Sequence, residues 1–135
     1  MDRIGWLERR SVLMHIAERR RGDVRMLLRN KRYDGAVYLV GYVVECMLKA
    51  AICQWIGEER LPERYMTHDL NWLREQAVIT MESHLRKQWQ NVEIWNVTVR
   101  YYSQVISAQS ARQFIDAMEV IRKWLLEVMQ QRERR

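Results

Sequence analysis

The stretch AVYLVGYVVECMLKAAICQWI, residues 36–56, decides the fold of this chain. It is almost wholly apolar, and its only charged side chains are Glu45 and Lys49. A membrane-spanning helix needs about twenty apolar residues in a row, whereas about nine precede the first charge here. We therefore expect the buried central helix of a soluble, cytoplasmic protein that does not associate with a membrane.

The composition of the whole chain agrees with a helical fold. The 135 residues are 48% hydrophobic and 30% charged, with only five glycines and one proline. Such a composition argues against disorder and against a β-sandwich, which needs more turn residues. The length matches one domain, so we expect an all-α fold in which residues 1–135 form a single helical domain.

Periodicity and capping residues predict the elements around the central stretch. We expect a helix over about 3–31 that divides at Gly22-Asp23, followed by the central helix from a cap at Asp34 to a stop at Gly57. A short helix capped by Thr67 or Asp69 and a helix over 80–90 should come next. An irregular or extended link over 91–97 should lead to a helical turn around Arg100, and Ser107 or Ser110 should cap the last helix.

Polar exceptions within the central helix are ordered along one face. Tyr38, Gly41, Tyr42, Glu45 and Lys49 follow one another at steps of three and four residues, so they form one stripe. A buried carboxylate without a partner would cost several kcal/mol. Glu45 should therefore pair with Lys49, or with an arginine or a helix terminus elsewhere. The stripe fits a structural ion pair as well as a functional site.

The two cysteines give no sign of a disulfide. Cys46 and Cys53 lie seven residues apart on one predicted helix, so their Cα atoms are separated by about 10 Å and cannot be bridged. Two reduced, buried thiols fit a cytoplasmic compartment. No set of His, Cys and carboxylate residues has the spacing of metal ligands, and we expect neither a metal nor a cofactor.

The chain is basic, with a net charge of +6, and most of its cations are arginines. Arginine pairs bidentately with phosphates and carboxylates, so this surface favours a nucleic acid or an acidic protein somewhat more than charge alone would. For the basic runs 19–21 and 132–135, however, we expect a solvated helix face or a frayed tail more than a binding surface.

Three motifs together resemble a known family. The stretch from Ala36 to Ala50 is similar to the second-helix signature of HEPN domains. His68-Asp69-Leu70, after a proline-containing loop, resembles the His-Asp-Leu element of the family. Trp95 followed by Arg100-Tyr101 is similar to the element that precedes its last helix. The resemblance covers roughly residues 30–125.

This resemblance implies an up-and-down bundle of four to five helices, usually a homodimer, from prokaryotic toxin–antitoxin and defence systems. Partners implied in the same way are RNA and a small nucleotidyltransferase-like protein. Many family members are metal-independent ribonucleases, in which an Arg-x4-6-His motif late in the chain supplies the acid/base histidine and a phosphate-binding arginine. This sequence departs from that pattern, because no histidine follows Arg100.

The three histidines, His15, His68 and His84, offer only partial replacements. Arg10 and His15 match the motif literally, but they precede the signature helix, and about one accidental match is expected in a chain with this many arginines. His68 starts a helix, where it either fixes the loop by hydrogen bonding or joins Glu45 and Arg100 in a phosphate-handling cluster. The structural role is the commoner one for a histidine in that position.

Two functions therefore stand after the sequence alone. The first is a HEPN-like module that binds RNA, a nucleotidyltransferase-like partner or both, and catalyses nothing. The second is a ribonuclease toxin that uses Arg100 with His68 as an unusual base. The candidate catalytic residues are Arg100 and His68, and the candidate binding residues are Tyr42, Glu45, Lys49, Asp69 and Tyr101.

Overall fold

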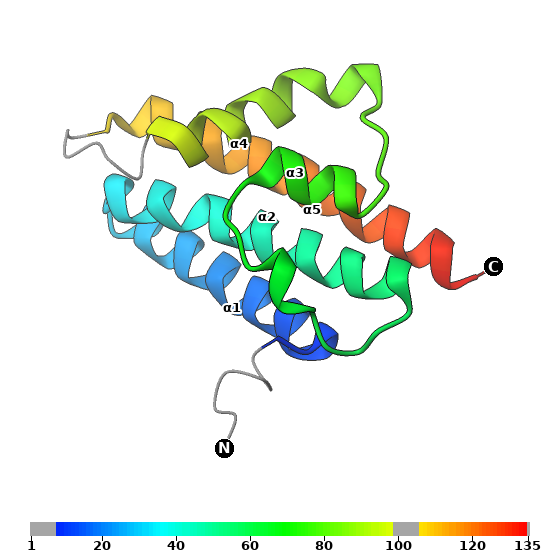
Figure 1. The fold of residues 1–135 in the computed structure, drawn as a ribbon. Helices are drawn as coiled ribbons and strands as arrows, with labels where there is room; N and C mark the ends of the chain where they lie inside the picture. Colours follow the sequence, from blue (N-terminus) through cyan, green and yellow to red (C-terminus); the bar gives the residue numbers. More distant parts are fainter. Residues whose placement is uncertain (1–7, 99–105, 135) are drawn as a thin grey trace.

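The computed structural model describes residues 8–98 and 106–134, with the backbone alone at 95–98, and its described part holds five α-helices (Figure 1). The elements in chain order are α1 Arg10–Arg29, α2 Tyr33–Ile56, the 3₁₀ turn η1 Glu63–Tyr65, α3 Leu70–Gln76, the 3₁₀ turn η2 Ser83–Leu85, α4 Arg86–Thr98 and α5 Ala108–Glu133. The only strand-like pairing among the described residues is an isolated bridge between Arg9 and Arg60. The predicted all-α bundle of four to five helices is confirmed.

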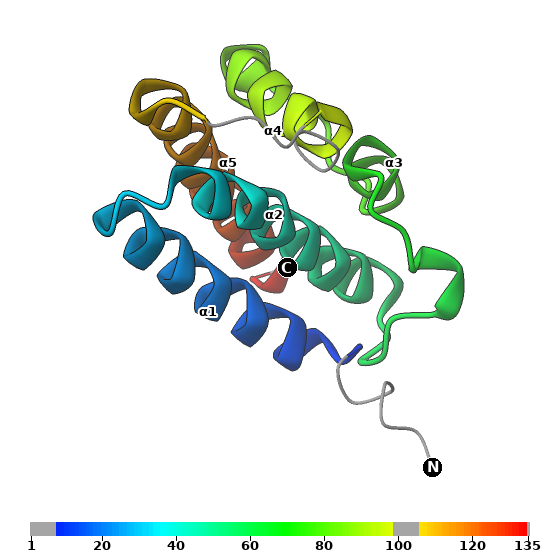
Figure 2. The same ribbon diagram turned by 90° about the vertical axis from the view of Figure 1, so that its left-hand side faces the viewer.

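Helix α2 lies in the middle of the bundle, with α1 on one side and α3 and α4 on the other (Figure 2). Most of its surface is buried, and Val37, Val40, Val43, Val44 and Leu48 are fully buried, whereas Tyr38 is exposed. By length and composition α2 could cross a membrane, but 78% of its most apolar window is buried inside the molecule. The prediction of a core helix is confirmed.

The boundaries of α2 follow from its sequence with one correction. The helix ends at Gly57, whose φ of 72° is left-handed, and the amide of Glu58 returns to the Cys53 carbonyl oxygen at 3.0 Å. Asp34 was predicted to cap the start, but it lies within the first turn, and no side chain caps this helix. A carboxylate in a first turn still interacts favourably with the helix dipole.

Two other predictions of secondary structure are wrong. Helix α1 continues through Gly22-Asp23, because Leu13, Ala17 and Val24 share one buried face along its whole length. The stretch 91–97 lies inside α4 and is not a link.

The sequence of α4 alternates polar and apolar residues locally, which suggested an extended piece. Leu85, Trp89 and Val92 instead form a buried face at helical spacing, and packing of that face against α2 and α5 decides the conformation.

Helix α5 begins as its sequence predicts. Ser107 is the N-cap, and its hydroxyl oxygen accepts a hydrogen bond from the Ser110 amide at 3.1 Å. The predicted apolar stripe faces the core, with Met118, Ile121 and Leu125 fully buried.

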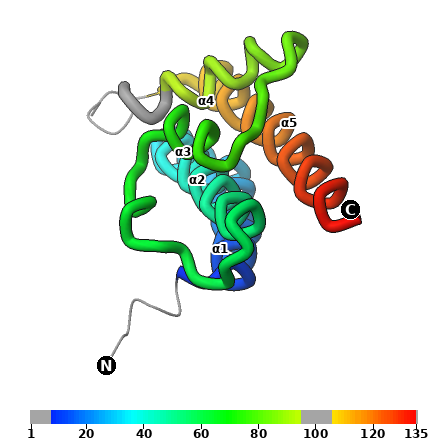
Figure 3. Tube along the Cα trace, turned by 45° about the vertical axis from the view of Figure 1, so that its right-hand side comes forward, coloured from blue at the N-terminus to red at the C-terminus, as the bar shows by residue number. Residues whose placement is uncertain are grey.

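The segment after α2 wraps past the start of α1 before it reaches α3 (Figure 3). Backbone hydrogen bonds fix this crossing: the Arg10 amide donates to Glu59 at 2.8 Å, and the Leu61 amide donates to Glu8 at 3.0 Å. Leu61 and Tyr65, which belong to this segment, are buried. The segment is thereby held against the bundle, which positions the residues that precede α3.

Candidate functional site

Glu45 and Lys49 form a buried ion pair on α2. They lie one turn apart, and the Lys49 Nζ is 3.0 Å from the Glu45 Oε2. Their side chains are only 6% and 8% exposed, respectively. A pair removed from water to this extent survives only when further hydrogen bonds satisfy the charges. The predicted partner of Glu45 is therefore present, and the second carboxylate oxygen needs a partner of its own.

His68 supplies that second partner. Its Nδ1 lies 2.6 Å from the Glu45 Oε1, while 49% of its side chain remains exposed. The contact joins the segment before α3 to the middle of α2, across 23 positions of the sequence. Both oxygens of Glu45 are thus engaged, one by Lys49 and one by His68.

The residues next to His68 hold its backbone in place. Asp69 is the N-cap of α3, and its carboxylate accepts a hydrogen bond from the Trp72 amide at 3.1 Å. The Asp69 amide in turn donates to the Thr67 hydroxyl oxygen at 3.2 Å. Asp69, proposed from the sequence as a binding residue, is a helix cap whose Oδ1 is engaged by the Trp72 amide.

Two tyrosines from α2 flank the exposed side of this cluster. The Tyr42 ring meets the His68 ring edge-on, with centroids 6.1 Å apart and an angle of 84° between the planes. The Tyr38 and Tyr42 hydroxyls are 3.3 Å apart. We call Tyr38, Tyr42, Glu45, Lys49 and His68 the polar cluster. It brings together four of the polar residues on the predicted stripe and the His68 that follows the loop.

The polar cluster has a definite chemical capacity. When Glu45 is ionised, the proton of a neutral His68 must sit on Nδ1, facing the carboxylate, and Nε2 becomes an acceptor. A carboxylate that orients an imidazole in this way is the arrangement that general acid/base sites use. The same contacts also serve to anchor a loop.

The cysteines of α2 add no nucleophile to the cluster. Burial raises the pKa of the Cys46 thiol to about 11, and the nearby charge of Glu45 raises it further in the same direction. Burial likewise raises the pKa of Cys53 to about 11. Both are free cysteines, and both stay protonated at neutral pH.

Arg100 and Tyr101 lie outside the described residues, as does the side chain of Trp95. Whether they approach the polar cluster is therefore still a prediction. The described residues contain no group of three or more His, Cys, Asp or Glu side chains arranged to hold a metal ion.

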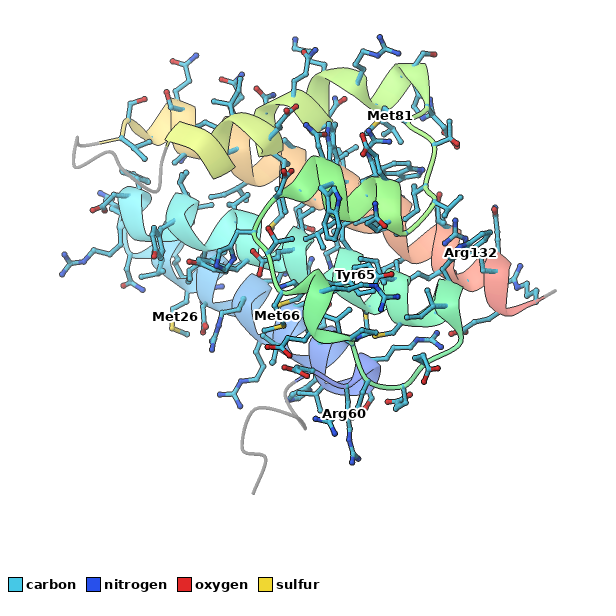
Figure 4. All side chains as sticks on the ribbon, viewed as in Figure 1. Met26, Arg60, Tyr65, Met66, Met81 and Arg132 are labelled. Atoms are coloured by element: carbon cyan, nitrogen blue, oxygen red, sulfur yellow. The ribbon has the colours of Figure 1, made fainter. Side chains whose placement is uncertain are left out.

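Arginines of both basic runs singled out in the sequence form contacts within the chain. In the first run, Arg20 pairs with Asp23 and Arg21 pairs with Glu119. Arg132 lies near the end of α5 (Figure 4). Its guanidinium is 4.7 Å from the centroid of the Trp55 ring and donates to the carbonyl oxygens of Ala77 and Val78, just after α3. These arginines mainly hold the fold together.

A different basic feature was not predicted from the sequence. Arg25, Arg29, Lys31 and Arg112 surround an open hollow of about 380 Å³ together with Leu28 and Tyr33. We call this set the basic hollow. Arg25 and Arg29 lie four residues apart on one helix, which was the available signal. Arg112 comes from a helix far along the chain, so spacing alone did not reveal the set.

Comparison with protein families identifies this chain's similarity. A model of the HEPN domain matches residues 11–129, which include all the described members of the polar cluster and of the basic hollow. No curated protein and no solved structure matches the chain significantly.

Proposed function

The chain belongs to the HEPN domain family, and from that membership we propose that it is a cytoplasmic, homodimeric RNA-binding module of a toxin–antitoxin or defence system. Membership indicates a module of nuclease or toxin type in general. Our proposal is narrower, because we infer that this module binds RNA without cleaving it.

One observation carries the binding-only proposal, namely where the three histidines lie. His15 is exposed on α1, and the Arg10 that precedes it in the motif is paired with Glu133. His84 is exposed and lies 3.5 Å from Glu82. His68 is bound to Glu45, and no histidine follows Arg100 in the sequence. The usual Arg-x4-6-His pair of an active member therefore has no counterpart late in this chain.

The basic charge of the chain supports RNA as the partner. A net charge of +6, carried mostly by arginines, favours phosphate contacts over non-specific solvation alone. The homodimer and the nucleotidyltransferase-like protein partner rest on the family resemblance. The mass of the purified protein in solution, measured by sedimentation at several concentrations, tests the homodimer, and a monomer at every concentration contradicts it.

A second candidate function, a metal-independent ribonuclease, is favoured by the contact between His68 and Glu45. That contact leaves Nε2 of a half-exposed ring as an acceptor for a ribose hydroxyl proton. Arg100 would then stabilise the phosphate, as proposed from the sequence.

The decisive experiment incubates the purified protein with labelled single-stranded RNA in EDTA. Binding that weakens with salt, with intact RNA after prolonged incubation, supports the binding module. Cleavage that His68→Gln abolishes and His84→Gln preserves supports the ribonuclease instead. A loss of cleavage in Arg100→Ala as well would assign that residue its predicted role. Failure to bind RNA at any salt concentration overturns both.

A further inference from the structure

The basic hollow lies at the end of the bundle where α1 turns into α2 and where α5 begins (Figure 1). It gathers cations from three places in the chain: Arg25 and Arg29 from α1, Lys31 from the turn, and Arg112 from the first turns of α5. Tyr33 adds a phenol group to the lining. The hollow is remote from the polar cluster, because the twelve residues from Tyr33 to Glu45 span about 18 Å of helix.

None of its four cations has a carboxylate partner among residues 8–98 and 106–134. The acidic residues nearest to them in sequence are Asp23, Asp34 and Asp116. Asp23 pairs with Arg20, and neither Asp34 nor Asp116 forms an ion pair with any of the four cations. The link 99–105 contains no acidic residue in its sequence. Within the part of the chain that the structure describes, four positive charges therefore share one surface hollow without neutralisation.

Elsewhere along α1 and α5, ion pairs between the two helices neutralise their charges. Arg21 on α1 binds Glu119 on α5, with the Arg21 Nε 2.7 Å from the Glu119 Oε1. Glu18 binds Arg122, and Arg10 binds Glu133. Residues earlier in α1 thus pair with residues later in α5, which defines an antiparallel register.

Continuing this register past Arg21 brings Arg29 toward Arg112. The three ion pairs between α1 and α5 each join opposite charges. At the next position of the register, Arg29 and Arg112 instead bring two like charges together, and Lys31 adds a third. Like charges at close range destabilise a surface, so interspersed signs are the usual arrangement. An anion from outside the chain would remove the repulsion.

The backbone holds Lys31 in a fixed position at the hollow. Its φ of 61° is left-handed, and the turn is closed by bonds from the Lys31 amide to Leu28 and from the Arg32 amide to Leu27, at 3.0 Å and 2.8 Å. A non-glycine residue in this region is uncommon and has to be held by its surroundings. Because the backbone at Lys31 is already ordered, binding has to order only its side chain.

We propose that the basic hollow binds successive phosphate groups of an RNA backbone. Guanidinium groups make bidentate hydrogen bonds to phosphate oxygens, and four clustered cations favour an anion with several charges over a single carboxylate. A nucleoside polyphosphate offers the same chemistry and is separated from RNA by the experiment below. This inference rests on the proposed RNA-binding function and gives that function a location.

The experiment compares two triple variants that remove the same charge. Arg25→Gln/Arg29→Gln/Arg112→Gln removes the arginines of the hollow. Arg19→Gln/Arg86→Gln/Arg134→Gln removes three exposed arginines that form no hydrogen bond or ion pair within the described part of the chain. Both variants are first compared with the wild type by thermal melting. Binding of a fluorescent single-stranded RNA is then followed by anisotropy over a range of salt concentrations.

The hollow variant should lose at least tenfold in affinity, and its salt slope should fall by about two, because each single-strand phosphate contact contributes about 0.7. The control variant should bind within about twofold of the wild type. Equal losses in both variants would show that only net charge matters and would overturn the inference. Unchanged binding in the hollow variant would overturn it and leave the RNA-binding function standing.

Titration of the wild type with inorganic tripolyphosphate and with ATP, followed by calorimetry, separates the remaining outcomes. Binding of these anions without binding of RNA overturns both the RNA inference and the proposed function. Competition of tripolyphosphate with RNA in the wild type, and its loss in the hollow variant, supports the inference. Absence of binding to any of the three probes overturns both proposals.

Discussion

The polar cluster and the basic hollow differ in whether their charged side chains have partners within the chain. In the cluster, Glu45 is buried, and each of its oxygens has a partner within the chain, from Lys49 and from His68. In the hollow, four exposed cations have no carboxylate partner among the described residues. Charges that are satisfied internally support the fold, whereas charges left unsatisfied at the surface are available to another molecule. The contrast predicts that changes in the cluster alter stability and that changes in the hollow alter binding.

The largest expected effect comes from Glu45→Ala. It leaves the Lys49 ammonium buried without its carboxylate, and breaking a buried pair costs about 3 to 5 kcal/mol. The free energy of unfolding, measured by urea denaturation, should fall by that amount. The double variant Glu45→Leu/Lys49→Met should recover most of the loss, because it removes both charges. A single variant as stable as the wild type would contradict the structural role of the pair.

The thiols beside the cluster provide a test of burial without a charged partner. The raised pKa values of Cys46 and Cys53, about 11, leave about a hundredfold less thiolate at pH 8 than in an unfolded chain. Alkylation by iodoacetamide at pH 8 should therefore be about a hundredfold slower in the native protein than in urea.

The pH dependence of stability follows from the same shift. Since folding raises both pKa values above the ordinary value of 9, the thiols' contribution to stability is fully present below pH 9 and is lost as pH rises through about 11. A Cys46→Ala/Cys53→Ala variant should lose less stability over this range than the wild type. Equal pH dependence in the two proteins would argue against buried thiols.

A smaller effect is expected from His68→Ala. The ring is half exposed, so its hydrogen bond to Glu45 is partly screened, and removing it should cost about 1 kcal/mol. That loss corresponds to about a fivefold change in the unfolding equilibrium, measured by urea denaturation. His84→Ala is the matched control, because its side chain is 71% exposed, and it should not change stability. A loss of several kcal/mol in His68→Ala would mean that the loop depends on this contact for its whole conformation.

The smallest effect on stability should come from Arg112→Glu, in the basic hollow. The variant places a carboxylate where the register of the ion pairs would place one, opposite Arg29. Exposed pairs contribute about 0 to 1 kcal/mol, so thermal melting at low salt should show an unchanged or slightly increased stability. Glu119→Arg, which breaks the pair with Arg21, should instead lower it. A clear destabilisation by Arg112→Glu would show that the hollow has a structural role.

Sequence patterns predicted the parts of this molecule that depend on local chemistry. The extent of α2 followed from an apolar run that ends at Gly57, and the pairing of Glu45 with Lys49 followed from their spacing of four residues. The caps Asp69 and Ser107 were among the residues proposed for those positions.

The parts that depend on distant segments could not be predicted in the same way. The alternation in 91–97 suggested an extended piece, but packing against other helices makes it part of α4. The bond from His68 to Glu45 depends on how the loop crosses the start of α1. The hollow depends on Arg112 reaching the α1 to α2 turn from another helix. In each case the contact depends on how distant segments pack against one another, and the local sequence pattern does not predict that packing.

The tight turn between α1 and α2 also bears on how the chain folds. Only three residues separate the two helices, and no other pair of described elements packs together more extensively. An interface between neighbours in sequence requires little loop-closure entropy, so it forms early and quickly. We therefore expect the α1–α2 hairpin to be structured in the folding transition state, with α5 docking afterwards and bringing Arg112 to the hollow last. The surface that we propose for RNA binding would then be complete only in the fully folded chain.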